Sequence, residues 1–424
     1  MGQVLSNVGW LIGDRAFRMC LGLVIGVWVA RYLGPEQFGE YNYASAFVFL
    51  FGAIAAVGGM DGILVRELVR DDHLKHEILG TAFALRMIGS GFAFLVCVGA
   101  ICYLRPQEIT AQWLVGIAAA GMVLLSFDTV DVWFQGRVQS KYTVYAKNAG
   151  FISMSVLRVI LILANAPLIA FAWAAFGEIA IGAVLLVGFY WTQGERIVCW
   201  QISLARARAI LRLAWPLILS GLASGIYIKI DQVMLGNMVG SRAVAMYAAA
   251  VKITEVWNIL PLAVMSSLYP LLVKLHGQSQ ELYRQRLRQI ICLFFWSSCL
   301  ISLCVALLSR SIVEVLFGDQ YAEAAEVLSV HAYSGVLVSL GVVINYVVTL
   351  NGATIASLYG AVAGACANVL FNLWFIGSWG IIGAAVASLI GYGVAPLVQA
   401  CLYDRKFVVL LVKAVWPFPG KASV

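Results

Sequence analysis

The sequence predicts an all-α integral membrane protein with about 12 transmembrane helices, arranged in two lobes of six helices each. Of its 424 residues, 62% are hydrophobic and only 12% are charged, whereas soluble proteins carry about 25% charged residues. The mean hydropathy is +0.91, and apolar stretches of about 20 residues, the length that a helix needs to cross a bilayer, recur along the chain. Helices are the expected elements because lipid offers no hydrogen-bond partners to the backbone of an open sheet.

The individual spans follow from these apolar stretches and from the turn residues between them. The turns are Gly34-Pro35 after the first span, Asn165-Ala166-Pro167 between the fifth and sixth, and Asn351-Gly352 before the eleventh. The predicted spans are 8–33, 41–60, 79–104, 111–130, 142–164, 168–191, 209–232, 243–271, 290–309, 325–350, 354–376 and 379–402. The first stretch is not expected to be a cleaved signal peptide, because it has no basic n-region and no small-residue cleavage site.

Basic residues in the short loops predict the orientation of these spans. If the N-terminus lies in the cytoplasm, 17 basic residues fall in the inside segments 61–78, 128–141, 192–212, 271–289 and 403–424. The outside loops then hold four, which are Arg31, Arg105, Arg242 and Arg310. Both termini are therefore expected in the cytoplasm.

The two halves of the chain are expected to be related by duplication. Gly34, Tyr41 and Ala44 recur at a spacing of 206 residues as Gly240, Tyr247 and Ala250, and Tyr145 recurs as Tyr359. Six spans in each half mean that both halves enter the membrane from the same side, as in repeats related by an axis along the membrane normal.

The expected domains are an N-terminal lobe at 1–195, a cytoplasmic linker at 196–212, a C-terminal lobe at 213–402 and a cytoplasmic tail at 403–424. In the linker, Arg206, Arg208 and Arg212 alternate with apolar residues. This pattern fits an interfacial helix or a solvated loop equally well.

Five short motifs resemble one family of transporters. They read DRAFR at 14–18, VARYLGPEQFGEY at 29–41, DGILVREL at 61–68, DQVMLG at 231–236 and LFGDQY at 316–321. The first two are similar to the opening signature of bacterial O-antigen and polysaccharide-repeat flippases, which belong to the multidrug/oligosaccharidyl-lipid/polysaccharide exporter superfamily. The longest run, at 29–41, is the most specific, and the motifs together extend over most of the chain.

The resemblance implies a MATE-like transporter of the bacterial inner membrane. Its substrate would be an oligosaccharide repeat linked to undecaprenyl diphosphate, and Na⁺ or H⁺ would be the coupling ion. Membrane lipid and other polysaccharide-assembly membrane proteins would be its partners. No organic cofactor, metal centre or nucleic-acid partner is expected.

Charged residues inside the spans are candidates for the substrate site, because an ionisable group in lipid usually faces a cavity or a partner. The seven basic candidates are Arg15, Arg18, Arg86, Lys147, Arg158, Lys229 and Lys252. The acids at such depths are Asp14, Glu178, Asp231 and Glu255, which leaves a surplus of three positive charges. A surplus of this sign suits an anionic diphosphate, and arginine offers a fork of donors for phosphate oxygens.

Helical spacing groups some of these residues on shared faces. Arg15 and Arg18 share a face of the first helix with Asp14 and are expected to contact the headgroup; alternatively, Asp14 and Arg18 form a structural pair. Lys147 and Arg158 are 11 residues apart on one face of the fifth helix. They form either a basic track for the headgroup or, for Arg158, a pair with Glu178.

A second candidate site consists of Asp231, Asn368 and Asn372. The two asparagines are four residues apart on one helical face. A carboxylate and amide oxygens suit a hard cation, so these residues are candidates for the coupling ion. The alternative is that they join helices by hydrogen bonds.

The leading functional hypothesis is a flippase that works by alternating access. A multidrug or cation antiporter of the same superfamily is the first alternative, although acids would be expected to dominate a cavity for cationic drugs. A membrane glycan polymerase or ligase is a more distant alternative, because such an enzyme is expected to carry a larger external loop. A non-enzymatic transporter is therefore expected.

Overall fold

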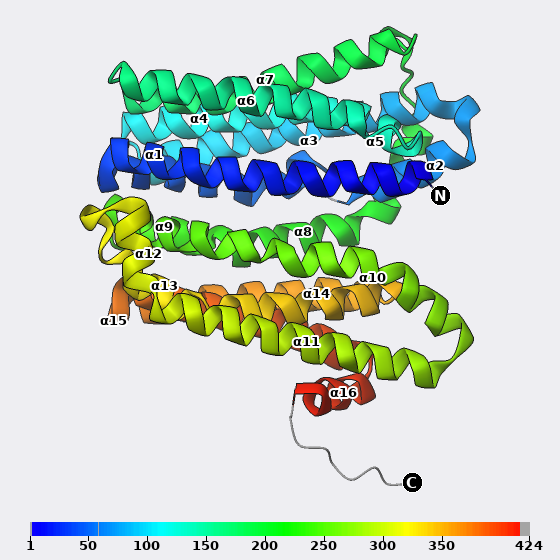
Figure 1. The fold of residues 1–424 in the computed structure, drawn as a ribbon. Helices are drawn as coiled ribbons and strands as arrows, with labels where there is room; N and C mark the ends of the chain where they lie inside the picture. The colour runs from blue at the N-terminus through cyan, green and yellow to red at the C-terminus, as the bar shows by residue number, and fades with distance from the viewer. Residues whose placement is uncertain (1, 58, 416–424) are drawn as a thin grey trace, which may run out of the picture. The chain divides into compact units, whose positions relative to one another are not determined.

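The computed structural model describes the backbone of residues 2–57 and 59–415, and their side chains except those of 2–16, 72, 259 and 354 (Figure 1). Every regular element in this part of the chain is helical. The first elements are α1 (Gly2–Ala55), α2 (Met60–Arg70), η1 (Asp72–Leu74), α3 (Lys75–Leu104), α4 (Ile109–Leu124), η2 (Leu125–Asp128), α5 (Thr129–Gly136), α6 (Lys141–Leu163), α7 (Leu168–Thr192), η3 (Ile197–Cys199) and α8 (Leu204–Met238). The others are α9 (Ser241–Trp257), α10 (Ile259–Gln278), α11 (Gln280–Leu307), α12 (Ser309–Phe317), η4 (Asp319–Tyr321), α13 (Ala324–His331), α14 (Ser334–Leu350), α15 (Thr354–Tyr403) and α16 (Arg405–Val415).

The helical membrane fold predicted from composition is confirmed. Within the described residues, ten helical segments are long and apolar enough to cross a membrane. Two helices, α1 with 54 residues and α15 with 50, are about twice as long as one crossing requires. Each has a break in its backbone, at Gly34 and at Gly380 respectively, so these two helices account for four of the 12 predicted spans.

The break at Gly34 lies at the predicted turn. Gly34 has φ of 69° and ψ of 173°, a conformation that side chains with a Cβ rarely adopt. Pro35 then starts the next helical segment, where its missing N–H costs nothing. Figure 1 shows α2 at the same end of its unit as the N-terminus, so the chain reverses direction within α1. Gly240, the equivalent of Gly34 in the expected duplication, also has a positive φ, of 123°.

The chain forms two compact units. The first takes in residues up to Gly236 together with Gly240–Ala245, and the second takes in Asn237–Val239 and the chain from Met246 on. Almost all of α8 therefore packs with the first unit, although the predicted boundary at 213 grouped it with the second lobe. One tie within the first unit is the hydrogen bond of 2.6 Å that Arg105 Nη2 donates to the Gly236 carbonyl. Whether the predicted lobes 1–195 and 213–402 each move as one body stays a prediction.

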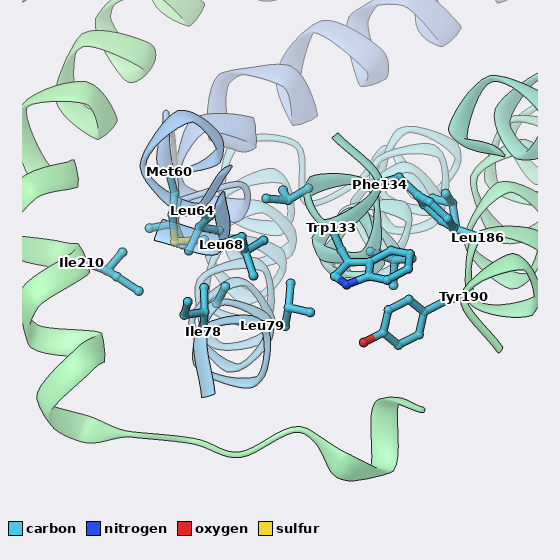
Figure 2. Close-up of a cluster of buried hydrophobic side chains, with 14 of the residues drawn as sticks. Met60, Leu64, Leu68, Ile78, Leu79, Trp133, Phe134, Leu186, Tyr190 and Ile210 are labelled. Carbon is cyan, nitrogen blue, oxygen red and sulfur yellow. The ribbon is translucent and has the colours of Figure 1, made fainter. Parts of the chain in front are cut away.

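A cluster of buried apolar side chains holds one end of the first unit together (Figure 2). The α2 helix contributes Met60, Leu64 and Leu68, which are spaced by four residues and so share one face. The labelled neighbours are Ile78 and Leu79 of α3, Trp133 and Phe134 of α5, Leu186 and Tyr190 of α7, and Ile210 of α8. The cluster thus connects helices from α2 to α8, across about 150 residues of the sequence.

The predicted linker is docked on this same end of the first unit. The Trp200 indole N–H donates a hydrogen bond of 3.1 Å to the Tyr190 hydroxyl. From residue 204 the linker is helical, and Arg206 of this first turn forms ion pairs of 3.0 Å with Glu67 and 3.1 Å with Glu77. The segment therefore packs against α2, α3 and α7, and neither of the two forms expected from sequence describes it fully.

We expect Gly80→Ala to loosen this docked linker. A Cβ on Gly80 would overlap the backbone of Gln201, and forcing extra atoms into a packed contact costs about 1–3 kcal/mol. The matched control is Gly99→Ala in the same helix, where nothing lies within 4 Å of the added Cβ. Thermal unfolding of the purified variants should show a lower midpoint for Gly80→Ala only; equal midpoints would contradict the packing described here.

The second unit has its own core, built from α10, α11, α14, α15 and α16. Its last helix, α16, is amphipathic: Phe407 and Ala414 are buried, while Val409 and Val412 are 52% and 62% exposed. The predicted cytoplasmic tail therefore begins with a helix that packs on the second unit.

A hydrogen bond of 2.7 Å between the hydroxyls of Ser298 and Ser339 also joins α11 to α14 in this unit.

Candidate substrate pocket

Two of the predicted headgroup residues line one pocket inside the first unit. The cavity has a volume of about 150 Å³ and lies between α1, η2, α6 and α7. Its charged lining residues are Arg18, Asp128, Lys147 and Glu178. Helices that are separate in the sequence therefore bring Arg18 and Lys147 together.

Arg18 reaches from α1 to α6. Its Nε donates a hydrogen bond of 3.0 Å to Asn148 Oδ1, and its guanidinium carbon lies 5.2 Å from the centre of the Phe151 ring. Stacking on an aromatic face and one directed hydrogen bond hold a guanidinium in a defined plane. The pairing of Arg18 with Asp14 and the role of Arg15 stay predictions, because the side chains of 14 and 15 lie outside the described residues.

Lys147 lies between two carboxylates that follow α4. Its Nζ is 3.1 Å from Asp128 Oδ1 and 3.6 Å from Asp131 Oδ2. Thr143 Oγ1 donates a hydrogen bond of 2.6 Å to Asp131 Oδ1, and Gln135 Nε2 donates one of 3.2 Å to Asp131 Oδ2. Asp131 is therefore fixed by neighbours on α5 and α6, so that Lys147 meets a preformed anionic site.

Arg158 lies on α6 with Lys147, as predicted from their spacing. Its Nη2 contacts Glu178 Oε2 of α7 at 3.0 Å. This is the ion pair that the sequence suggested as the alternative to a basic track. Because Glu178 also lines the pocket, a ligand that contacts Glu178 lies next to the charge of Arg158.

Arg86 lies outside the lining of this pocket, and its role as a substrate residue stays a prediction. Its side chain is only 4% exposed and forms an ion pair with Asp61. Its Nη1 lies 3.5 Å from Thr129 Oγ1, the residue after Asp128. Arg86 is not in the pocket lining, so it connects α2 and α3 to the start of α5.

The charge of this pocket also differs from the expected surplus. The lining holds two basic residues, Arg18 and Lys147, and two acids, Asp128 and Glu178. Beside the lining, Asp131 pairs with Lys147 and Arg158 pairs with Glu178. The sequence count omitted both aspartates, because Asp131 lies beyond the predicted fourth span, 111–130, and Asp128 was assigned with it to the inside segment 128–141. In the structure this span continues to Gly136, which puts both aspartates inside it.

The other predicted site residues are distributed over both units. Lys229 and Asp231 lie on α8, where Asp231 is fully buried. Lys252 lies on α9. Asn368 and Asn372 are fully buried on α15, and Asn372 Nδ2 donates a hydrogen bond of 3.0 Å to Asn368 Oδ1. The shared face of the two asparagines is thus confirmed, and their role in binding a cation stays a prediction.

The residues that the sequence did not single out are Asp128, which lines the pocket, and Asn148 and Asp131, which contact the lining residues Arg18 and Lys147. A signal for the aspartates was present, since residues three apart on a helix share a face and an acid at the end of a span is a functional candidate. Asn148 has no such signal, because a single amide in a polar stretch of helix is ordinary.

The pocket can exchange one set of anions for another. A diphosphate that enters would compete with Asp128 and Asp131 for Lys147, and would meet the planar donors of Arg18. Such an exchange would leave the displaced carboxylates without their cation, so it is favourable only for a ligand that makes further contacts.

The chain is similar to transporters of known type. A family model described as polysaccharide biosynthesis protein matches residues 4–276, and the MatE model matches residues 216–374. Over 404 residues the chain is 22% identical to the succinoglycan biosynthesis transport protein ExoT of Rhizobium meliloti, covering 90% of this chain and 79% of that protein.

Solved structures share the fold. An inward-facing multidrug resistance transporter of the MATE family matches with a TM-score of 0.77 and 18% identity, covering 93% of this chain and 95% of that one. The lipid II flippase MurJ in an inward closed conformation matches with a TM-score of 0.72 and 14% identity, covering 96% and 89%. These matches confirm the MATE-like fold class predicted from the sequence.

Proposed function

Because this chain belongs to the polysaccharide biosynthesis protein family, we propose that it is a flippase for oligosaccharide repeat units linked to undecaprenyl diphosphate. The observation that carries the proposal is the placement of Arg18 and Lys147 in one pocket within a membrane-spanning helical unit. The similarity to a succinoglycan transport protein supports a polysaccharide precursor as the cargo.

In the proposed cycle, the diphosphate headgroup binds at Arg18 and Lys147 while the polyprenyl tail stays in the surrounding lipid. The two lobes then alternate between states that open to opposite sides of the membrane. The other predicted substrate residues, Arg15, Arg86, Arg158, Lys229 and Lys252, are proposed to contact the sugars or to position the helices around them.

The direct test is reconstitution of the purified protein into vesicles that contain a lipid-linked oligosaccharide with a labelled sugar. Appearance of the label on the opposite face of the vesicle, at a rate above that of protein-free vesicles, is expected. Transport of cationic drugs without transport of the lipid-linked sugar would replace this proposal with the alternative below.

A second candidate function is multidrug or cation antiport. The observation in its favour is that the carboxylates of Asp128 and Glu178 line the pocket and that of Asp131 lies beside it, 3.6 Å from Lys147 Nζ. Two of these bind Lys147 and the third binds Arg158, which leaves less negative charge for a cationic drug. We therefore prefer the flippase.

We propose that the protein lies in the bacterial inner membrane with both termini in the cytoplasm. On a background in which all nine cysteines are replaced, Val198→Cys, at a position that is 94% exposed, should react with a membrane-impermeant reagent only after the cells are opened. Gln320→Cys, also exposed, should react in intact cells. The reverse labelling pattern would overturn the orientation.

We further propose that Asp231, Asn368 and Asn372 serve the coupling ion, Na⁺ or H⁺. All three side chains are fully buried, and buried polar groups in a membrane protein often mark ion pathways. Asp231→Asn is expected to make transport in vesicles independent of the ion gradient while the protein stays folded. Unchanged dependence on the gradient would return Asp231 to a structural role.

A further inference from the structure

A second cavity, in the second unit, has the chemistry of an anion site. It has a volume of about 420 Å³ and is bordered by the ends of α10, α11 and α14 and by α16. Its lining includes four basic side chains, Arg284, Arg288, Lys406 and Lys413, and one acid, Asp404. The acid is already engaged, because Asp404 Oδ1 accepts a hydrogen bond of 2.8 Å from the backbone N–H of Lys406 in the first turn of α16.

The basic residues come from two helices that are joined at the cavity. Arg284 and Arg288 are four residues apart on α11 and therefore share the face that carries Leu287. Arg288 Nη2 donates a hydrogen bond of 3.4 Å to the Lys413 carbonyl of α16. The basic side chains thus border one opening instead of spreading over the surface.

The wall of the cavity contains a buried donor that has no partner among the described residues. The Tyr283 side chain is 6% exposed, and its hydroxyl has no hydrogen-bond partner among the described residues. The His276 ring packs edge-on against it with ring centres 5.1 Å apart, and His276 Nδ1 also has no such partner among them. A buried hydroxyl without a partner is unfavourable, and an oxygen of a ligand in the cavity would satisfy it.

The position of α16 indicates where that ligand comes from. Val409 lines the cavity and is 52% exposed, and Val412 on the same helix is 62% exposed. A helix that buries one apolar face and exposes further apolar residues beside basic ones is suited to lie in the headgroup region of a bilayer. Apolar surface therefore continues from the basic cavity to the outside, which fits a lipid better than a soluble anion.

We propose that this cavity binds the phosphate group of an anionic phospholipid in the leaflet next to α16. The phosphate meets Arg284 and Arg288, the Tyr283 hydroxyl donates to one of its oxygens, and the acyl chains lie along the apolar residues of α16. Basic cavities at the cytoplasmic ends of membrane helices are suited to such headgroups. The site lies in the second unit, so it stands independently of the proposed transport function and of the pocket in the first unit.

The test is native mass spectrometry of the detergent-purified full chain titrated with phosphatidylglycerol. The double variant Arg284→Gln/Arg288→Gln is expected to bind the lipid at least about tenfold more weakly. The matched control is Arg286→Gln on the same helix, because Arg286 is exposed, bonds to Gln289 and does not line the cavity. This control is expected to bind the lipid like the unchanged protein.

Two further measurements separate lipid binding from a loss of folding and from binding of free phosphate. Tyr283→Phe is expected to weaken lipid binding several-fold without lowering the thermal unfolding midpoint, because its hydroxyl makes no hydrogen bond within the described protein. A parallel titration with inorganic phosphate is expected to show no saturable binding. The proposal is overturned if the double variant binds the lipid as well as Arg286→Gln does, or if free phosphate binds as tightly as the lipid.

Discussion

Replacing Arg18 with alanine is expected to abolish export of the lipid-linked glycan in cells while the protein still accumulates in the membrane. Arg18 lines the pocket and is oriented by Asn148 and Phe151. Losing one partner of a fully buried charged contact costs about 2–5 kcal/mol. Because Arg18 is half-buried, solvent screening reduces this to about 1–3 kcal/mol, which corresponds to at least about a fivefold loss of affinity for the headgroup. Surface glycan, measured at matched protein levels, reports the effect.

Three companion variants separate binding from folding. Arg18→Lys keeps the charge but loses the planar fork, so export should persist in part. Arg31→Ala on the same helix, outside the pocket lining, should leave export intact. If Arg18 only balances Asp14, the double change Asp14→Asn/Arg18→Gln should restore normal export, and that result would reject the headgroup role.

Replacing Lys147 with glutamine is expected to have the second-largest effect, because it acts on both stability and transport. The change leaves Asp128 and Asp131 without the cation between them. Breaking a fully buried pair costs about 3–5 kcal/mol. Since the Lys147 side chain is 34% exposed, solvent screening reduces this to about 1–3 kcal/mol. A lower thermal unfolding midpoint and a loss of export should appear together.

The double variant Lys147→Gln/Asp128→Asn distinguishes the two contributions. Removing one carboxylate relieves the repulsion between Asp128 and Asp131, so the unfolding midpoint should recover. Export should stay low, because the pocket still lacks the cation that we propose binds the diphosphate. Recovery of export along with stability would mean that Lys147 serves only the structure.

Local patterns in the sequence were sufficient for the spans and for the main reversals of the chain. Gly34-Pro35 and Asn165-Ala166-Pro167 are turns by their own chemistry, and both occur where predicted. The pair between Arg158 and Glu178 was also accessible, because a charged residue in each of two adjacent spans restricts the choice of partner.

Features that depend on the exact end of a span or on distant contacts were not accessible. The predicted fourth span ended six residues early, so Asp131 was assigned to a loop. It was therefore not recognised as a partner of Lys147. The docking of the linker through Arg206 depends on residues more than 100 positions away, such as Glu77. The α16 helix lies in the segment 403–424, which the sequence analysis described only as a cytoplasmic tail.

The matched charges of the pocket have a consequence for selectivity inside a living cell. The cytoplasm is rich in small phosphate-bearing metabolites, and a strongly cationic pocket would attract all of them. Because Asp128 and Asp131 already occupy Lys147, a free anion gains little by displacing them. A lipid-linked diphosphate is confined to the bilayer and adds contacts from its sugars and tail, so it can complete the exchange. The pairing of Lys147 with Asp128 and Asp131 would thus weaken the binding of soluble phosphate metabolites more than that of a substrate that arrives through the membrane.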